Sequence, residues 1–306
     1  MADKLASVAD AVAALVRDGD SLVIGACLEA AIPFAAVHEI IRQGRRGLNA
    51  IAPISDAATD MLIGAGCVER VTGAWVGNVS GGLAHNYRRA AEQGLPHPIA
   101  IEDHSNFSLA MALMAGANGL PYVPVRSLLG SDILKTNRRL IRADDPFSPG
   151  KPVILVPACK PDVAILPVQR SDRDGNCHFW GSLVLVQEAA LAAERVILLA
   201  DEIVDTSVIV SDPNRILFPS FRVSAVCPAR AGCHPSSLTG VWRRDTPFFV
   251  EYHTRSRDRE GFLSWLREWV FDVEGHEAYL DKLGDRLERL RITGWAPPEP
   301  VNFAAV

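Results

Sequence analysis

The sequence predicts an α/β protein, with an open, mostly parallel sheet covered by helices on both faces and a helical cover formed by the C-terminal part. Three observations lead to this prediction. Between residues 5 and 200, short apolar runs alternate with amphipathic segments, the pattern of a parallel sheet between two helical layers. Polar loops containing glycine follow several of these runs. From Arg257 onward, the periodic segments are helical.

The sequence of residues 5–52 predicts two helices, each followed by a strand. Residues 5–18 form an amphipathic helix, and residues 21–25 form a buried strand. The apolar face of that helix consists of Val8, Val12, Leu15 and Val16. Pro33 suits the first position of a second helix, which ends near Gly44. Residues 48–52 form the next strand.

The stretch from Val71 to Asp132 predicts two further strand, loop and helix units in succession. Residues 71–76 are apolar and lead into the loop 77–82, which is followed by a helix. Residues 98–101 lead into the polar loop 102–106, and residues 107–117 form a helix. Since ligands of open α/β sheets bind outside the carboxyl ends of the strands, these loops are the expected site.

The alternation continues to residue 200. Residues 153–156 and 163–168 are strand candidates, and residues 172–176 form a turn that leads into residues 177–180. A helix over 186–194 and a strand over 196–200 follow. Residues 258–291 predict two helices, and residues 292–306 a surface tail. Because no repeat or low-complexity linker divides the chain, we expect a single domain over 1–306.

Composition and charge exclude several classes of protein. The net charge is −5, from 31 basic and 36 acidic residues, which argues against a nucleic-acid or anionic-membrane partner. Charges interrupt the apolar residues near the N-terminus before a signal-peptide core is formed, so we expect a cytoplasmic protein. The uncharged run 107–125 contains two prolines and two glycines, which favours a buried helix and strand over a membrane span.

Metal and nicotinamide sites are not expected. The six cysteines contain no Cys-x-x-Cys pair, and the eight histidines do not cluster at ligand spacing. Residues 64–69 have Glu69 where a dinucleotide fingerprint requires its third glycine. His234, in the turn Gly232-Cys233-His234-Pro235, is more often a residue that satisfies backbone groups than a ligand.

Glu102 is the candidate catalytic residue. It directly follows an apolar run and has Ser105 and Asn106 close by, an environment that tunes a carboxylate for nucleophilic or general-base chemistry. The alternative is that Glu102 or Asp103 caps the helix that begins near Ser105.

Taken together, these loops resemble the α-type subunit of the family I coenzyme A transferases, the glutaconate and 3-oxoacid CoA-transferase group. The resemblance extends from about Val12 to Leu283, and it rests on the order and spacing of several short motifs rather than on one. These motifs are residues 76–78, 102–106, 114–121, 126–132, 161–164, 169–172 with 175–176, 201–204 and 232–235.

The resemblance implies transfer of CoA between carboxylic acids, with CoA as a substrate. In that family a glutamate attacks the acyl-CoA thioester, a mixed anhydride forms, and the returning CoA thiolate gives a glutamyl-CoA thioester. Backbone N–H groups of a glycine-rich loop would stabilise the oxyanions. The glutamate belongs to a β-type subunit, in a Ser-Glu-x-Gly loop, and this chain contains no Ser-Glu pair.

The chain is therefore expected to supply half of an active site, completed by a β-type partner, and to act on an acyl-CoA and a free carboxylic acid. The residues expected to bind substrate or CoA are Gly25, Gly77, Asn78, Ser80, Gly81, Ser105, Asn106 and Ser131. One departure concerns the first loop, which in the family begins with two glycines followed by Phe-Gly. This chain has Ile24-Gly25-Ala26-Cys27 and retains only Gly25.

Two other functions remain open from the sequence. The first is a component of an acyl-CoA hydrolase or of a ring-opening enzyme that cleaves carbon–carbon bonds, a branch of the same fold in which Glu102 would be the base. The second is a ligand-sensing module without catalysis, although the sequence contains no DNA-binding helix-turn-helix and no basic face.

Overall fold

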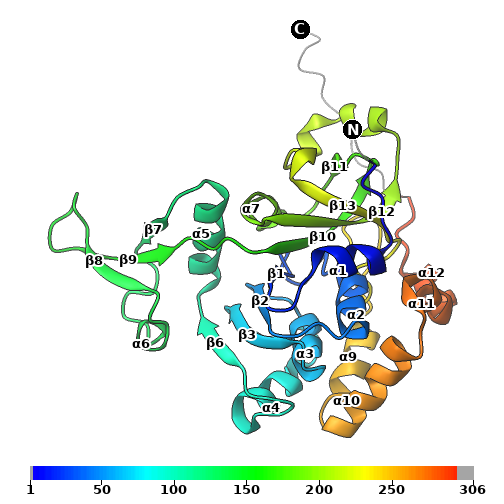
Figure 1. Cartoon of the computed structure of the whole chain (residues 1–306), viewed down its shortest axis with the longest axis horizontal. Coiled ribbons are helices and arrows are strands. Elements are labelled where there is room, and N and C mark those ends of the chain that lie inside the picture. Colours follow the sequence, from blue (N-terminus) through cyan, green and yellow to red (C-terminus); the bar gives the residue numbers. More distant parts are fainter. Residues whose placement is uncertain (1–2, 295–306) are drawn as a thin grey trace.

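The computed structural model describes residues 3–294, and within them an eight-stranded sheet forms the centre of the molecule (Figure 1). Seven of its strands run parallel, in the order β13-β12-β10-β1-β2-β3-β6, and β11 pairs antiparallel with β10. The parallel strands are β1 (Ser21–Val23), β2 (Leu48–Ala52), β3 (Val68–Gly73), β6 (Ala100–Asp103), β10 (Val163–Ser171), β12 (Arg195–Ile203) and β13 (Val223–Pro228). The predicted α/β fold is confirmed.

The order of strands reverses between β1 and β10. The chain first moves outward from β1 through β2 and β3 to β6, then returns to place β10 on the other side of β1 and moves outward to β13. Such a reversal opens a crevice at the carboxyl ends of the two adjoining strands. The loops that leave β1 and β10 therefore lie where an open α/β sheet binds its ligand.

Helices cover both faces of this sheet (Figure 1). On one face lie α1 (Val8–Leu15), α2 (Phe34–Arg42), α3 (Ala57–Gly64) and α4 (His85–Gln93), and on the other α5 (Asn106–Ala117) and α7 (Val186–Ala192). The apolar periodicity explains α1, because its residues Val8 and Val12 are buried and Ser7 caps its first turn. Helix α2 begins at Phe34, with Pro33 as its N-cap rather than its first residue.

A separate three-stranded antiparallel sheet extends from the body (Figure 1). Its strands are β7 (Tyr122–Val125), β9 (Pro152–Pro157) and β8 (Ile141–Asp144), and the short helix α6 (Ile133–Thr136) belongs to the same region. Residues 153–156 thus form a strand as predicted, but not as a member of the parallel alternation. A short apolar run gives no information about which sheet it joins.

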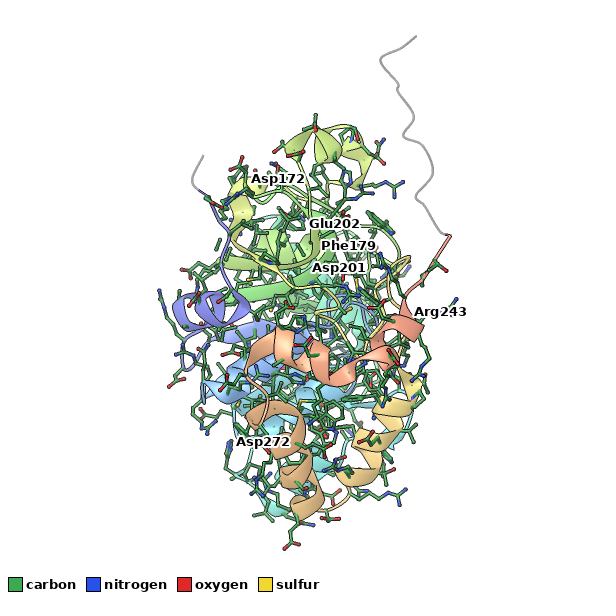
Figure 2. The ribbon with its side chains drawn as sticks, turned by 90° about the vertical axis from the view of Figure 1, so that its right-hand side faces the viewer. Asp172, Phe179, Asp201, Glu202, Arg243 and Asp272 are labelled. Carbon is green, nitrogen blue, oxygen red and sulfur yellow. The ribbon has the colours of Figure 1, made fainter. Side chains whose placement is uncertain are left out.

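The C-terminal cover begins earlier than predicted, at α9 (Thr246–Arg255), and continues through α10 (Arg259–Leu266) and a π-helical turn over Arg267–Phe271. Helices α11 (Gly275–Leu283) and α12 (Asp285–Leu290) follow (Figure 2). Gly284 breaks the predicted second helix into these two parts, with φ of +49°. Aromatic side chains join this cover to α2, among them Phe34, Phe248, Phe249, Trp265 and Tyr279. Most of the predicted tail 292–306 lies outside the described residues.

The prediction from the sequence did not include α3, α9 or β13. Several shorter elements complete the described chain. The short elements are β4 (Gly77–Asn78), β5 (Gly82–Leu83), β11 (Cys177–His178), α8 (Thr206–Val210) and 3₁₀ turns at Pro213–Arg215 and Ser220–Arg222. The turn predicted over 172–176 joins β10 to β11. Among residues 3–294, no helix has the length and apolar character that crossing a membrane requires.

Candidate functional site

The loops that leave the carboxyl ends of β1, β2 and β3 meet the loop that follows β13. Arg244, in the loop after β13, contacts a residue of each of the other three: the backbone of Glu29, the carboxylate of Asp56 and the hydroxyl of Ser80. We refer to Asp56, Asn78, Ser80 and Arg244 as the edge cluster. It lies beside Gly25, at the carboxyl edge of the sheet.

Asn78 shapes the turn that holds Ser80. Its side-chain oxygen accepts hydrogen bonds from the backbone N–H groups of Ser80 (3.0 Å) and Gly81 (2.9 Å), and its Nδ2 donates to the carbonyl of Phe249 in α9. Asn78 is buried, with 1% of its surface exposed. The backbone donors that the glycine-rich sequence predicted for oxyanion binding are therefore occupied within the turn itself.

Two of the predicted glycines are required by close packing. Gly25 has φ of +106°, and a Cβ there would lie 2.4 Å from the backbone oxygen of Ile54. A Cβ at Gly77 would lie 2.1 Å from the ring of Trp75, which folds over it. Both positions therefore exclude a larger residue, because a side chain would meet backbone or an aromatic ring.

Asp56 and Arg244 were not found by sequence reasoning. Asp56 is fully buried and has φ of +49°, an unusual conformation for a residue other than glycine. Its carboxylate accepts from the N–H of Val79 (3.1 Å) and from Arg244, whose guanidinium lies 3.8 Å from the ring centre of Phe249. Burial raises the pKa of Asp56, and the charge of Arg244 offsets this only in part. Residues held in such conformations cluster at functional sites.

A buried network fixes the residue next to Arg244. The carboxylate of Asp245 accepts from His234 Nε2 (3.1 Å) and from two nitrogens of Arg286, and His234 Nδ1 lies 2.6 Å from the hydroxyl of Tyr279. Burial opposes ionisation of Asp245, but the hydrogen bonds from His234 and Arg286 outweigh it and leave the pKa below its ordinary value. His234 thus satisfies side chains rather than the backbone of its own turn, and it connects the site loop to the C-terminal helices.

The loop after β1, in which this chain has Ala26 and Cys27 in place of the family's pattern, is covered by another segment. Residues 182–185 cover it, because Leu185 N donates to the carbonyl of Ala26 (3.0 Å) and the Cys27 thiol donates to that of Ser182 (3.1 Å). Burial raises the pKa of Cys27 to about 12. Leu28 takes the left-handed conformation, with φ of +63°, which is uncommon for a residue other than glycine. The backbone of residues 26 and 27 is therefore covered in this chain.

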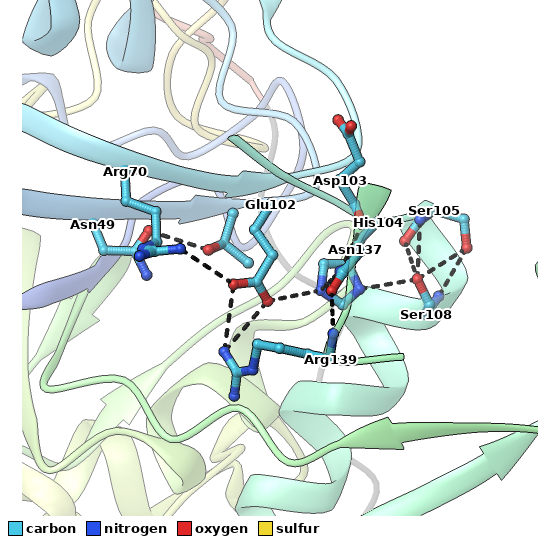
Figure 3. A network of polar contacts seen from close by, with 10 residues as sticks. Asn49, Arg70, Glu102, Asp103, His104, Ser105, Ser108, Asn137 and Arg139 are labelled. Atoms are coloured by element: carbon cyan, nitrogen blue, oxygen red, sulfur yellow. Dashed lines mark hydrogen bonds and ion pairs between the residues drawn. The ribbon is translucent and has the colours of Figure 1, made fainter. Parts of the chain in front are cut away.

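Glu102 lies within β6 rather than after it, and its side chain faces α5, whose Leu109 and Ala112 line the same pocket (Figure 3). Its carboxylate pairs with His104 Nε2 (3.3 Å) and with Arg139 (3.3 and 3.4 Å). The hydrogen bond with His104 lowers the pKa of Glu102 and Arg139 lowers it further, against the effect of partial burial. These residues line a pocket of about 270 Å³, together with Ser21, Asn49, Thr72, Leu109, Cys159 and Lys160.

The remaining predicted residues lie near Glu102 or on the small sheet. Ser105 caps α5, with its hydroxyl accepting from the N–H of Ser108 at 3.0 Å (Figure 3). The same hydroxyl lies 3.3 Å from that of Ser127. Asn106 is the exposed first residue of α5. Ser131 accepts from the N–H of Ile133 (3.2 Å) at the start of α6. The structure therefore brings together Gly25, Gly77, Asn78, Ser80 and Gly81, and places the others elsewhere.

The edge cluster lies at the carboxyl edge of an open parallel sheet, which is where enzymes of the open α/β class bind their ligands. No group of three or more metal-ligating side chains within residues 3–294 has the geometry to hold an ion. A family model described as Coenzyme A transferase matches residues 5–229. The chain belongs to the coenzyme A transferase family.

Individual relatives agree with this assignment. The chain is 37% identical to the A subunit of 3-oxoadipate CoA-transferase from Pseudomonas knackmussii, over 92% of this chain and 99% of that protein. It is 34% identical to the A subunit of glutaconate CoA-transferase from Acidaminococcus fermentans, over 94% and 95% of the two chains. The solved structure of that glutaconate CoA-transferase superposes with a TM-score of 0.91 and 32% identity, over 95% of this chain and 96% of the other.

A more distant relative has a different reaction. The cholesterol ring-cleaving hydrolase IpdA subunit of Rhodococcus jostii is 27% identical, over 89% of this chain and 93% of that protein. Identity is thus higher to the two transferase subunits than to this hydrolase subunit.

Proposed function

We propose that this chain is the α-type subunit of a cytoplasmic CoA-transferase that moves CoA between small carboxylic acids. We further propose that the glutamate which forms the glutamyl-CoA thioester belongs to a β-type partner. One observation supports the assignment of this glutamate to the partner. Glu102 is paired with His104 and Arg139 on the α5 side of the sheet, whereas the edge cluster lies at the carboxyl edge, so Glu102 does not face it.

The lowered pKa of Glu102 supports the same conclusion. Its carboxylate already accepts from His104 and Arg139, and these hydrogen bonds make it less basic and so a weaker nucleophile towards a thioester. A Ser-Glu-x-Gly loop on a partner would instead supply a carboxylate to the edge cluster from outside. The role of this chain is then to bind and orient the acyl group beside Ser80 and Arg244.

An exposed apolar rim supports a partner at this edge. Leu83 is 52% exposed and Val79 45%, on either side of the Ser80 turn, and Trp75 is 40% exposed in the same loop. Leu183 and Val184 are exposed in the loop that covers Ala26. Exposed apolar groups that surround a polar site are typical of a surface that another subunit covers.

The proposal is tested with the reconstituted complex. The chain is tagged in its host, the co-purifying subunit is identified, and CoA exchange is assayed between an acyl-CoA and free acids. Glutaconate and 3-oxoadipate, the acids that appear in the names of the two relatives, are the first acceptors to try. We expect exchange that is lost when the glutamate of the partner's Ser-Glu-x-Gly loop is replaced. Purification of the chain alone as an active homo-oligomer would refute the partner assignment.

The pocket at Glu102 favours one second candidate, a hydrolytic or ring-opening activity with Glu102 as base. Glu102 and His104 line that pocket with room for a small group, and the chain is similar in sequence to the IpdA subunit. The Glu102→Gln variant discriminates between the two. If the Glu102→Gln complex retains CoA exchange while the partner's glutamate is indispensable, Glu102 is not the group that reacts. If the wild-type complex shows no exchange but has a hydrolytic activity that Glu102→Gln loses, the second candidate is established.

A further inference from the structure

The hydroxyl oxygen of Ser80 accepts two hydrogen bonds from the guanidinium of Arg244. Arg244 Nη2 donates to Ser80 Oγ at 2.9 Å and Arg244 Nε at 3.3 Å. A serine hydroxyl has two acceptor lone pairs and one hydrogen to donate. With both lone pairs directed at the guanidinium, the O–H hydrogen must point away from Arg244. Within residues 3–294, the hydroxyl of Ser80 donates to no other group.

The free donor is the hydroxyl rather than the backbone of the turn. The N–H groups of Ser80 and Gly81 both donate to Asn78, and the N–H of Val79 donates to Asp56. Ser80 itself is half-buried and lies next to the exposed Val79, so its turn is accessible to solvent. A substrate oxygen that arrives at this turn therefore meets the Ser80 O–H.

Arg244 is held rigidly enough to fix this direction. Its guanidinium pairs with the fully buried Asp56 and lies on the ring of Phe249, and its own side chain is only 20% exposed. The next residue, Asp245, is locked by His234 and Arg286. A donor whose orientation is set before the substrate binds costs no reorganisation during the reaction. The nearby positive charge also polarises the O–H and strengthens its hydrogen bond.

We propose that Ser80 Oγ donates a hydrogen bond to the acyl oxygen of the bound thioester, and that Arg244 is the positioning residue that keeps Ser80 in the donor role. The inference rests on the proposed transferase function. When a carboxylate adds to the acyl carbon, the C=O π electrons move onto that oxygen, and they return when the C–S bond breaks. The hydrogen bond from Ser80 is strongest while the oxygen carries the charge, and no proton is transferred.

The test is a double-mutant cycle in the complex with its partner, assayed for CoA exchange. We expect Ser80→Ala to lower kcat about 100-fold, the scale found for loss of one oxyanion donor, with KM changed by less than about threefold. Ser80→Thr, which retains the hydroxyl, should keep kcat within about tenfold. Arg244→Lys, which retains the charge but not the two-nitrogen fork, should lower kcat by a similar factor to Ser80→Ala.

The double variant decides whether Arg244 acts through Ser80. If it does, Arg244→Lys has no further effect on kcat in the Ser80→Ala background, whereas independent roles multiply the two losses. Ser264→Ala is the matched control, because this exposed serine of α10 also accepts from an arginine, Arg255, at 3.2 Å. Its kcat should equal that of the wild type. Circular dichroism and co-purification with the partner verify that each variant folds.

The outcomes separate this inference from the proposed function. An active wild-type complex whose Ser80→Ala variant retains full kcat would overturn the donor role of Ser80 while leaving the transferase assignment intact. Multiplying losses would overturn the positioning role of Arg244. A wild-type complex with no exchange between any acyl-CoA and acid would refute the proposed function, and the inference with it.

Discussion

The guanidinium of Arg244 donates to the carboxylate of Asp56, and this ion pair joins the loop after β13 to the start of α3. The carboxylate is fully buried, and the arginine side chain is 20% exposed. The same guanidinium also holds the Ser80 hydroxyl. The Arg244 side chain thus holds together three segments that are far apart in the sequence. Each of these contacts can be tested by substitution.

The first prediction concerns the Asp56→Asn variant. Removing the negative charge leaves the mostly buried Arg244 without its ionic partner, and a hydrogen bond to a charged group contributes about 1.5–3 kcal/mol. We expect the free energy of unfolding in urea to fall by roughly this amount. Asp132→Asn is the control, since Asp132 pairs with Lys135 on the exposed surface and such pairs contribute little. Equal effects of the two substitutions would contradict the importance given to the buried pair.

This contact shows where sequence reasoning reached its limit. Gly25, Gly77, Asn78 and Ser80 were predicted because glycine and small polar residues after apolar runs form a local pattern. Arg244 has no such local pattern, and it reaches Ser80 across 164 residues of sequence. Only the folded chain brings them together.

Glu102 shows a second limit, that of strand boundaries. The prediction ended the strand at the last apolar residue, but the pairing of β6 with β3 continues through Thr72 with Glu102 and Gly73 with Asp103. Backbone hydrogen bonds do not depend on the polarity of the side chain. Because Glu102 is a strand residue, its side chain points towards α5 and away from the loops at the carboxyl edge.

The second prediction concerns pH and Asp245. The pKa of Asp245 is lower in the folded protein than its ordinary value of 3.8, so its ionised form stabilises the fold above about pH 4, and this stabilisation is lost as the pH falls towards the folded-state pKa. The difference in unfolding free energy between the wild type and Asp245→Asn should be largest near pH 7 and should shrink below pH 4. Urea unfolding at several pH values measures it, and a constant difference down to pH 3 would show that the charge is not involved.

The third prediction compares two glycines with positive φ. Gly25→Ala places a Cβ 2.4 Å from the backbone oxygen of Ile54, which is not free to move aside, whereas Gly44→Ala meets nothing within 4 Å. We expect Gly44→Ala to cost about 1 kcal/mol of stability, the usual penalty for a left-handed alanine. Gly25→Ala should cost at least about 3 kcal/mol, since strain and overpacking add. Thermal unfolding of the two variants is the measurement, and similar melting temperatures would argue that the loop after β1 relaxes.

The last prediction tests the apolar rim with two leucines at opposite ends of α4. Leu83 precedes the helix, next to the Ser80 turn at the carboxyl edge of the sheet, and is 52% exposed. Leu95 follows the helix at the other edge and is 48% exposed. Because both side chains already face solvent, glutamate at either position should leave the stability of the isolated chain nearly unchanged. Only Leu83→Glu should weaken binding of the partner, by tenfold or more, since it places a charge within a surface that the partner desolvates. Titration of each variant with the purified partner measures the two dissociation constants. If Leu95→Glu weakened binding and Leu83→Glu did not, the partner would lie at the amino edge, and the site would not be completed across the edge cluster.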